Sequence, residues 1–364
     1  MKIIIRNCNV AELDIPLKYA TKLYNEFAIR HPNAFYLRTR QRGMQNWDGK
    51  IKYITKTGQF KIGLLPSVYK RCIELGIKPI IVDMRQPLPK VSKVVTQIGK
   101  YKLRPEQEKA VKAILSNKLG ETPFQIGVLD YTVNAGKTLI MSALYLSYKK
   151  QLKTLLITND SDWLNQAREE FKQYLPGEDI TFVQGKVLNW SNFTIGMVQS
   201  ISRNMRFYQK ELSQIDMVLV DEADQGGSKQ YQNVITRLFN TRIRIGLSGT
   251  IYMSKLAKDR VKNMNLECFF GKVIAEFKLK DSIKKGYSTK TVVKMVPGKP
   301  WYGNWESDCI SYKEIYDDSI TNCYTAWLMA YNRLLWNLNQ GRYPALVVCK
   351  HIAHCENLYK FFKK

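Results

Sequence analysis

Residues 124–148, FQIGVLDYTVNAGKTLIMSALYLSY, decide the fold expected of this chain. A short apolar run opens the stretch, Gly136-Lys137-Thr138 follows a turn-forming segment, and an apolar helical run closes it. N–H groups at the start of such a helix face bound phosphates, and the helix dipole favours negative charge there. The stretch therefore predicts a strand, a phosphate-binding loop and a helix, with Lys137 on the β- and γ-phosphates and Thr138 on Mg²⁺.

The loop departs from the common phosphate-loop pattern at two positions. Tyr131 stands where the first glycine is usual, and Asn134 stands where a second one often lies. Asn tolerates left-handed backbone better than other non-glycine residues, so the loop can still close around a phosphate. A chance Gly-Lys-Thr in an ordinary turn is the alternative. The residues expected to bind the nucleotide here are Thr132, Asn134, Ala135, Gly136, Lys137 and Thr138.

A second motif lies at the end of another apolar run. Residues 216–220 read as a buried strand, and Asp221-Glu222-Ala223-Asp224 follow it. Carboxylates at the carboxyl end of a parallel strand lie at the ligand-binding edge of an open α/β sheet. Asp221 is predicted to hold Mg²⁺, and Glu222 to orient and deprotonate an attacking water. Together with Lys137 they form the predicted catalytic set; a solvated acidic helix start is the alternative.

Composition limits the partners. The chain has 364 residues, enough for two or three domains, and carries 57 Lys and Arg against 31 Asp and Glu, a formal net charge of +26. Such an excess favours a polyanionic partner, most simply nucleic acid. An anionic membrane surface would compete, but no run of 18 apolar residues could span a bilayer. The seven cysteines include no Cys-x-x-Cys pair, which argues against structural zinc and for a reducing, cytoplasmic setting.

The first region, residues 1–95, reads as a small α+β nucleic-acid-binding domain. Ten Lys or Arg and one acid, Asp48, lie between residues 30 and 71. Helices are expected at 17–29 and 67–75, and strands at 35–39, 50–55 and 60–64.

The nucleic-acid contacts expected in this region are basic. A strand would place Arg38, Arg40 and Arg42 on one face, towards phosphates, and a solvated basic face is the alternative. Lys50 and Lys52 are further candidates. Trp47 is expected either to stack on a base or to hold the turn at residues 46–49.

From residue 96 to 285, strand and helix patterns alternate. Apolar runs without alternation imply strands buried on both faces, so the region predicts an α/β domain with a doubly wound parallel sheet. The expected strands are 124–129, 153–158, 193–198, 216–220 and 242–247. Residues 286–364 predict a linker around residues 297–303, a helix at 312–338, a strand at 344–349 and a helix at 355–363. One strand cannot form a sheet, so this part reads as the incomplete start of a further α/β domain.

The order of these motifs resembles that of the superfamily 2 helicases. Arg104 and Gln107 are similar to the family element in which the Gln reads adenine. Ser248-Gly249-Thr250 resembles the motif that couples nucleotide state to domain movement. Residues 158–166 and 197–200, with Gln199 and Ser200, stand where the nucleic-acid-tracking motifs are expected. The resemblance implies a RecA-like motor domain that uses ATP and Mg²⁺.

Further residues resemble one branch of the family, the phage recombination helicases. Residues 46–51 and 63–64 look like the branch's N-terminal nucleic-acid-binding domain, and residues 345–354 like the start of its second RecA-like domain. The resemblance implies a motor that remodels branched DNA in recombination, fork rescue and repair. Family members complete the ATP site with arginines of the second motor domain. The 364 residues are therefore expected to bind ATP but to hydrolyse it poorly unless a missing segment or a second polypeptide supplies them.

Three other functions remain open at this point. A nucleic-acid-binding module could use the nucleotide only as a switch, without turnover. An RNA helicase would carry the same motor motifs. The motor part of a restriction endonuclease would also share them, but the acids of the first 95 residues show no Asp…Glu-x-Lys nuclease arrangement.

Overall fold

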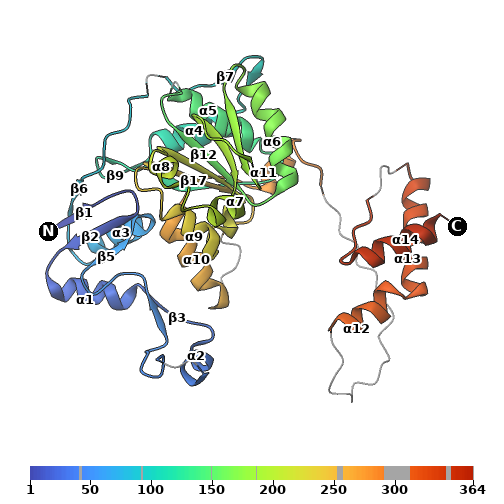
Figure 1. Ribbon diagram of the computed structural model, residues 1–364, viewed down its shortest axis with the longest axis horizontal. Helices are drawn as coiled ribbons and strands as arrows, with labels where there is room; N and C mark the ends of the chain where they lie inside the picture. Colours follow the sequence, from blue (N-terminus) through green and yellow to red (C-terminus); the bar gives the residue numbers. More distant parts are fainter. Residues whose placement is uncertain are drawn as a thin grey trace. The chain divides into compact units, whose positions relative to one another are not determined.

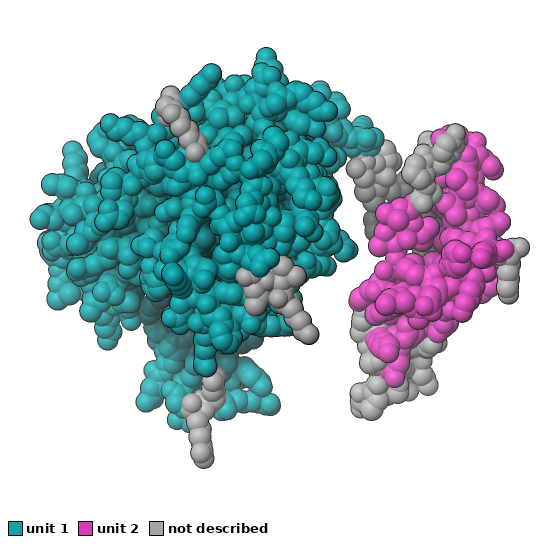
Figure 2. Space-filling model, turned by 45° about the horizontal axis from the view of Figure 1, so that its top comes forward, with its two compact units in different colours: residues 1–290 teal, residues 291–364 magenta. Residues whose placement is uncertain are grey.

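The computed structural model describes residues 1–40, 43–91, 93–148, 150–185, 187–251, 257–290, 312–341 and 346–363. The chain divides into two compact units, residues 1–290 and 291–364, which are coloured separately in Figure 2 and described here one at a time. The first unit contains both the expected N-terminal region and the expected motor domain.

An eight-stranded sheet forms the centre of the first unit, in the order β14-β13-β15-β12-β16-β17-β11-β18. All neighbouring strands run parallel except β14, which is antiparallel to β13. The α/β doubly wound fold is thus confirmed, and each of the five expected strands begins within two residues of its predicted start. The strands are β11 (Ile126–Tyr131), β12 (Thr154–Thr158), β13 (Ile180–Gln184), β14 (Val187–Leu188), β15 (Phe193–Met197), β16 (Met217–Asp221), β17 (Ile243–Ser248) and β18 (Val273–Phe277).

Helices cover both faces of this sheet (Figure 1). Side chains alternate between faces along each strand. Met217 and Leu219 of β16 pack with α4, α5 and α6, whereas Val218 and Val220 pack with α7, α9 and α10. The helices are α4 (Pro105–Leu115), α5 (Lys137–Ser147), α6 (Ser161–Tyr174), α7 (Val198–Arg203), α8 (Gln209–Ser213), η2 (Ala223–Gln225), α9 (Lys229–Ile235), α10 (Ala257–Phe270) and α11 (Leu279–Lys284).

The first region builds a second, four-stranded sheet in the order β5-β2-β1-β6. Ile3 and Ile5 of β1 are fully buried in its core. The region contains β1 (Lys2–Ile5), β2 (Val10–Asp14), α1 (Leu17–Glu26), β3 (Ala28–Arg30), α2 (Ala34–Arg40), β4 (Lys50–Lys52), β5 (Gln59–Lys61), η1 (Ile62–Leu64), α3 (Leu65–Glu74) and β6 (Ile80–Asp83). Two short hairpins follow, β7 (Gln97–Ile98) with β8 (Tyr101–Lys102), and β9 (Lys118–Leu119) with β10 (Thr122–Pro123).

The small sheet packs directly on the large one, and one hydrophobic cluster contains side chains of both. Arg244 of β17 is fully buried and donates to the Cys8 carbonyl at 3.0 Å and to Asn9 Oδ1 at 2.9 Å. Burial lowers the pKa of Arg244 to about 10. Ser67 donates to the carboxylate of Glu267 in α10. The boundary expected between residues 95 and 96 stays a prediction, because both regions belong to one compact unit.

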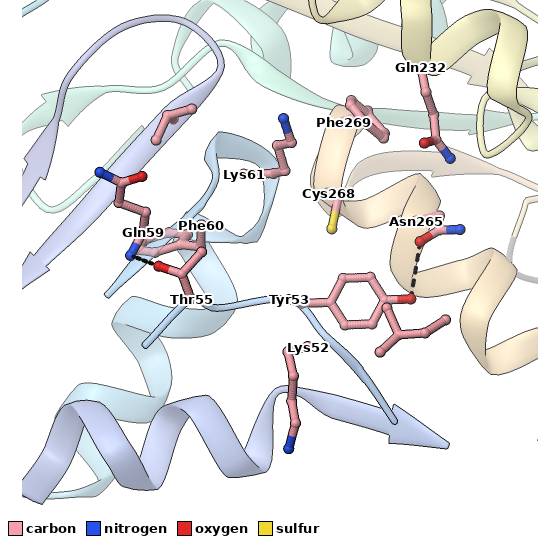
Figure 3. Close-up of a pocket in the computed structure, with 12 residues that line it drawn as sticks. Lys52, Tyr53, Thr55, Gln59, Phe60, Lys61, Gln232, Asn265, Cys268 and Phe269 are labelled. Atoms are coloured by element: carbon pink, nitrogen blue, oxygen red, sulfur yellow. Dashed lines mark hydrogen bonds between the residues drawn. The ribbon is translucent and has the colours of Figure 1, made fainter. Parts of the chain in front are cut away.

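A hollow of about 360 Å³ lies between the β4–β5 segment and α10 (Figure 3). Tyr53 crosses it and donates its hydroxyl proton to Asn265 Oδ1 at 3.0 Å. The residues around the hollow include none from the phosphate loop or the acidic motif. The hollow is therefore an interface feature between the first region and the large sheet.

The strand expected at residues 35–39 is wrong. Residues 34–40 form helix α2, in which Arg38 and Arg40 occupy the last turn. Basic side chains in the last turn interact favourably with the negative end of the helix dipole. Residues two apart in a helix point about 200° apart, so Arg38 and Arg40 do not share one face. Arg42 lies outside the described residues. The strand expected at 60–64 also ends early, at Lys61, where the 3₁₀ turn η1 begins.

The second unit contains α12 (Tyr312–Tyr316), the π-helix η3 (Asp317–Thr321), α13 (Tyr324–Asn339) and α14 (Ile352–Phe362). The single helix expected at 312–338 is wrong, because Asn322 N–H closes a wide turn on Asp317 O at 2.8 Å and Cys323 is extended. The strand expected at 344–349 is wrong for 346–349, which form no strand; residues 344 and 345 lie outside the description. The predicted linker at 297–303 lies outside it as well. The helix expected at 355–363 is confirmed by α14.

Candidate functional site

The phosphate loop joins β11 to α5 through two left-handed residues. Asn134 has φ 63° and Gly136 has φ 73°, and α5 begins at Lys137. A side chain at position 136 would also collide, because its Cβ would lie 2.3 Å from Gln107 Nε2. Asn134 thus adopts the backbone that its residue type favours, and Gly136 combines positive φ with close packing.

Gln107 and Arg104 hold this loop from the side of α4. Gln107 is only 3% exposed, donates from Nε2 to Ala135 O at 2.9 Å, and accepts from the Arg104 backbone N–H at 2.8 Å. The Arg104 guanidinium donates to Asn134 O at 3.0 Å. Both ends of the Gln107 amide are therefore engaged within the protein. The adenine contact expected of Gln107 stays a prediction. To bind adenine, the Gln107 amide would have to share or give up one of its two hydrogen bonds within the protein.

Lys137 connects the loop to the acidic motif. Its ammonium lies 3.1 Å from Asp221 Oδ1 and 3.2 Å from Glu222 Oε1. Because β17 lies between β11 and β16 in the sheet, the Lys137 side chain spans the carboxyl edge of three strands. Burial opposes the charge of Lys137, but the attraction of the two carboxylates outweighs it, and the pKa of Lys137 is raised. The charged form of the ammonium is therefore favoured, and it lies between the two carboxylates of the acidic motif.

Asp221 is the buried member of the acidic motif, at 2% exposure. Burial raises its pKa, and the neighbouring Lys137 opposes that shift. Its Oδ1 atom is enclosed and accepts no hydrogen bond from the described residues, although the Lys137 ammonium lies near it. A buried carboxylate oxygen of this kind fits a hard divalent cation. With the hydroxyl of Thr138 at the start of α5, Asp221 could hold Mg²⁺, although the described residues contain no group of three or more His, Cys, Asp or Glu that could hold a metal ion.

Glu222 and Ser248 form the next part of the site. Glu222 adopts left-handed backbone, with φ 51° and ψ 50°, which is costly for a non-glycine residue and is common at functional sites. Ser248 Oγ lies 3.2 Å from Asp224 Oδ1, 3.5 Å from Glu222 Oε2 and 3.2 Å from Thr250 Oγ1. The end of β17 is thereby hydrogen-bonded to the acidic motif.

Gly249 packs the same segment against the phosphate loop. A Cβ at Gly249 would lie 3.1 Å from Thr132 Cα and 3.2 Å from Tyr131 O. Thr132 itself is buried and donates its backbone N–H to Phe277 O at 3.0 Å. The loop, the acidic motif and residues 248–250 thus form one connected set of contacts at the carboxyl edge of the sheet.

The predicted nucleic-acid contacts fall in two places. Gln199 and Ser200 start α7 at the carboxyl end of β15, where Gln199 Nε2 donates to Asn159 O at 3.4 Å and Ser200 Oγ accepts from Gly185 N–H at 2.9 Å. Arg38 and Arg40 are exposed on α2, which projects from the first region in Figure 1. The residues predicted to contact nucleic acid therefore lie on two separate surfaces.

Trp47, Lys50 and Lys52 take part in local structure. Trp47 donates its indole N–H to Lys50 O at 2.9 Å, so it holds the turn, as one of the two expected roles requires. Lys50 is exposed. Lys52 pairs with Asp48 at 3.2 Å and its ammonium lies 4.6 Å from the centre of the Tyr24 ring.

Sequence reasoning missed several residues that support the site. Asn159 Nδ2 donates to Gln225 Oε1 at 2.6 Å and ties the end of β12 to the acidic motif. Lys285 pairs with the buried Glu106 at 2.7 Å, next to Arg104. These contacts join residues far apart in sequence, and no local pattern marks them.

Residues 100–253 match the family model described as the res subunit of type III restriction enzymes. The matched stretch contains Gln107, the phosphate loop, the acidic motif and residues 248–250, in the order in which the structure brings them together. Over this stretch the chain resembles the superfamily 2 helicases.

Two curated proteins are similar to this chain. The ATP-dependent DNA helicase uvsW of Enterobacteria phage T4 is 24% identical over 227 residues, which cover 57% of this chain and 43% of that protein. A protein of Acanthamoeba polyphaga mimivirus named as an ATP-dependent RNA helicase is 24% identical over 148 residues, covering 40% of this chain and 27% of its own. The chain spans less than half the length of each of these relatives.

Solved structures agree on the fold. A crystal structure of the UvsW helicase from bacteriophage T4 superposes with a TM-score of 0.59 at 21% identity, covering 76% of this chain and all of that one. A second crystal structure of T4 UvsW gives the same TM-score at 20% identity and covers all of this chain and 73% of its own. Among the described residues, no helix has the length and apolarity to cross a membrane.

Proposed function

We propose that this chain is the nucleotide-binding part of an ATP-dependent DNA helicase or translocase. Its substrate would be branched DNA in phage recombination, replication-fork rescue or repair, in the cytoplasm of the host cell. One observation carries the proposal: the Lys137 ammonium lies between Asp221 and Glu222 at the carboxyl edge of the sheet, with Ser248 bonded to the same motif. The two curated relatives are both named as ATP-dependent helicases, which supports this use of the site.

Each side chain has a distinct task in the proposed reaction. Lys137 binds the β- and γ-phosphates, and the amides of the loop and of the start of α5 hold the phosphate oxygens. Asp221 and Thr138 hold Mg²⁺, which when bound neutralises phosphate charge. Glu222 orients the attacking water and accepts its proton. Ser248 contacts Asp224 of the acidic motif. Through this contact, a movement of the acidic motif is transmitted to the segment that follows β17.

The proposed partner is nucleic acid. The net charge of +26 supplies the attraction to phosphates, and Gln199 and Ser200 lie on the same sheet edge as the nucleotide site. The phage relative is named a DNA helicase, which favours DNA. The mimivirus relative is named an RNA helicase, so RNA is the second candidate.

ATP hydrolysis by the 364-residue chain tests the proposal. We expect slow turnover that rises with branched DNA and is abolished in Glu222→Gln, while Glu121→Gln, at a fully exposed carboxylate, behaves like the parent chain. Turnover unchanged in Glu222→Gln would contradict the assignment of the base.

The switch alternative gives a different result. ATP and DNA binding without turnover, even after a second motor domain is supplied, would favour a nucleic-acid-binding module that uses the nucleotide only as a switch. Greater stimulation by RNA than by DNA would favour the RNA helicase.

A further inference from the structure

We propose that the tip segment, defined as residues 28–40 and 43–52, stacks exposed aromatic side chains on unpaired bases at a junction in the nucleic acid. This inference rests on the proposed function and adds to it the part of the substrate that is recognised. The tip segment comprises β3, α2 and β4 and projects from the first region (Figure 1). Its helix carries Phe35, 80% exposed, and Tyr36, 54% exposed.

The exposure of these two rings is unusual in its arrangement. Single apolar side chains on a protein surface are common and do not by themselves indicate a binding site. Here two aromatic residues are adjacent on one short helix, and Ala34 is the buried residue of that helix. The two aromatic side chains of α2 are thus turned outward, whereas Leu37 of the same helix is half-buried. Burying the rings would have stabilised the helix by the usual hydrophobic gain.

Other residues hold the tip segment in shape. Ala34 packs on Gly49, where a Cβ would lie 3.1 Å from Ala34 Cβ and where φ is 76°. His31 donates its backbone N–H to Gly49 O at 2.8 Å, and the His31 and Trp47 rings meet edge to face at 5.9 Å. These contacts fix the tip without Phe35 or Tyr36, which leaves both rings available to a ligand.

The charge around the rings identifies the ligand as nucleic acid. Residues 30–52 contain six Lys or Arg and one acid, Asp48. Arg38 and Arg40 are exposed on α2, and the Arg40 guanidinium lies 5.0 Å from the centre of the Tyr36 ring. Aromatic faces that stack on bases, beside cations that meet phosphates, are the usual means of holding unpaired strands. A second copy of this chain would bring the same positive charge and is disfavoured as the partner.

The base of the tip segment is hydrogen-bonded to helix α10, which packs on the large sheet. Tyr53, directly after β4, donates its backbone N–H to Phe27 O at 3.0 Å and its hydroxyl to Asn265 of α10 (Figure 3). Burial raises the pKa of Tyr53, so this hydroxyl remains a donor. Since α10 follows residues 248–250 in the chain, a base held at the tip is positioned relative to the nucleotide site.

A fluorescent base analogue tests the stacking. The probe is forked DNA with 2-aminopurine at the first unpaired position beside the junction, and its control is a duplex with the same base paired. We expect quenching of the fork probe by the parent chain. We expect quenching to disappear and affinity for the fork to fall roughly tenfold or more in Phe35→Ala and Tyr36→Ala.

The matched control is Phe239→Ala, which removes a 48% exposed ring just before β17, at the opposite edge of the sheet from the motifs. Salt dependence separates stacking from charge. The aromatic variants should keep the slope of log affinity against log salt, whereas Arg38→Gln with Arg40→Gln should reduce it by about 0.7–0.9 for each phosphate that is no longer neutralised.

Two results would overturn this inference. One is fork binding and quenching by Phe35→Ala equal to those of Phe239→Ala. The other is concentration-dependent self-association of the parent chain that Phe35→Ala abolishes, which would make the tip a protein interface. ATP hydrolysis stimulated by long unbranched DNA distinguishes failure of this inference from failure of the proposed function. Its retention in Phe35→Ala shows that the motor is intact, whereas its absence from the parent chain would count against the motor itself.

Discussion

Gly136 offers a sharp test of how the phosphate loop is built. Its φ of 73° is unfavourable for any residue with a side chain, and an added Cβ would lie 2.3 Å from Gln107 Nε2. Gln107 is buried and cannot move aside without breaking its bonds to Ala135 O and to the Arg104 N–H. The substitution Gly136→Ala therefore combines backbone strain with the displacement of a supporting side chain.

The size of the effect follows from these two contributions. Left-handed backbone costs a non-glycine residue about 1–2 kcal/mol. Two displaced hydrogen bonds of Gln107 add roughly 0.5–1.5 kcal/mol each. We expect Gly136→Ala to lower the free energy of unfolding by about 2–5 kcal/mol. Gly177→Ala isolates the backbone contribution, because Gly177 has φ 79° and open space around its Cβ position; its expected cost is about 1–2 kcal/mol.

Urea unfolding of the single and double variants measures the difference. In a Gln107→Ala background the collision is absent, so Gly136→Ala should cost no more than Gly177→Ala does in the parent chain. An ATP analogue should also bind Gly136→Ala more weakly, since the loop N–H groups lose their orientation. Equal costs for Gly136→Ala in both backgrounds would refute the idea that Gln107 is a rigid support for the loop.

Three further predictions concern the surrounding contacts. Lys137→Ala removes the cation beside buried Asp221 and raises the pKa of that carboxyl further above its value in the unfolded chain. Because stability falls as pH rises between the unfolded and folded pKa values, the loss of thermal stability should be larger near about pH 8 than near about pH 5. A loss that does not depend on pH would contradict this. Ser248→Ala removes the contact with Asp224 and should leave ATP-analogue affinity within about twofold while lowering nucleic-acid-stimulated hydrolysis; an equal fall in basal and stimulated rates would argue against coupling. Arg244→Ala should destabilise by about 3 kcal/mol or more in chemical denaturation, since buried acceptors lose a charged donor, and a loss below about 1 kcal/mol would show that the interface relaxes.

Part of the fold could be predicted because it depends on local patterns. Strands β11, β12, β16 and β17 are buried on both faces, so their sequences are continuous apolar runs. β18 escaped prediction, since its residues alternate between exposed and buried at the edge of the sheet. The strand predicted at residues 35–39 is wrong because it relied on arginines at every second position, and so few positions do not distinguish a strand from the helix that forms there.

The site divides in the same way. Lys137, Asp221 and Ser248 each follow a predicted strand, so the rule that parallel strands end at one edge was enough to place them together. Their roles in catalysis remain predictions. The support of the loop by Gln107 could not be foreseen, because the motif pattern assigns that side chain to a nucleotide and says nothing of the hydrogen bonds it makes inside the protein.

The sequence by itself determined the kind of domain and which residues are predicted to face a nucleotide, because apolar runs and the Gly-Lys-Thr loop act through backbone geometry over a few residues. Only the tertiary structure showed how the first region packs against the large sheet. The buried guanidinium of Arg244 and the Tyr53–Asn265 hydrogen bond join residues more than 200 positions apart. Only the tertiary structure showed that Phe35 and Tyr36 face outward, because the burial of a side chain depends on which surfaces the rest of the chain brings near it.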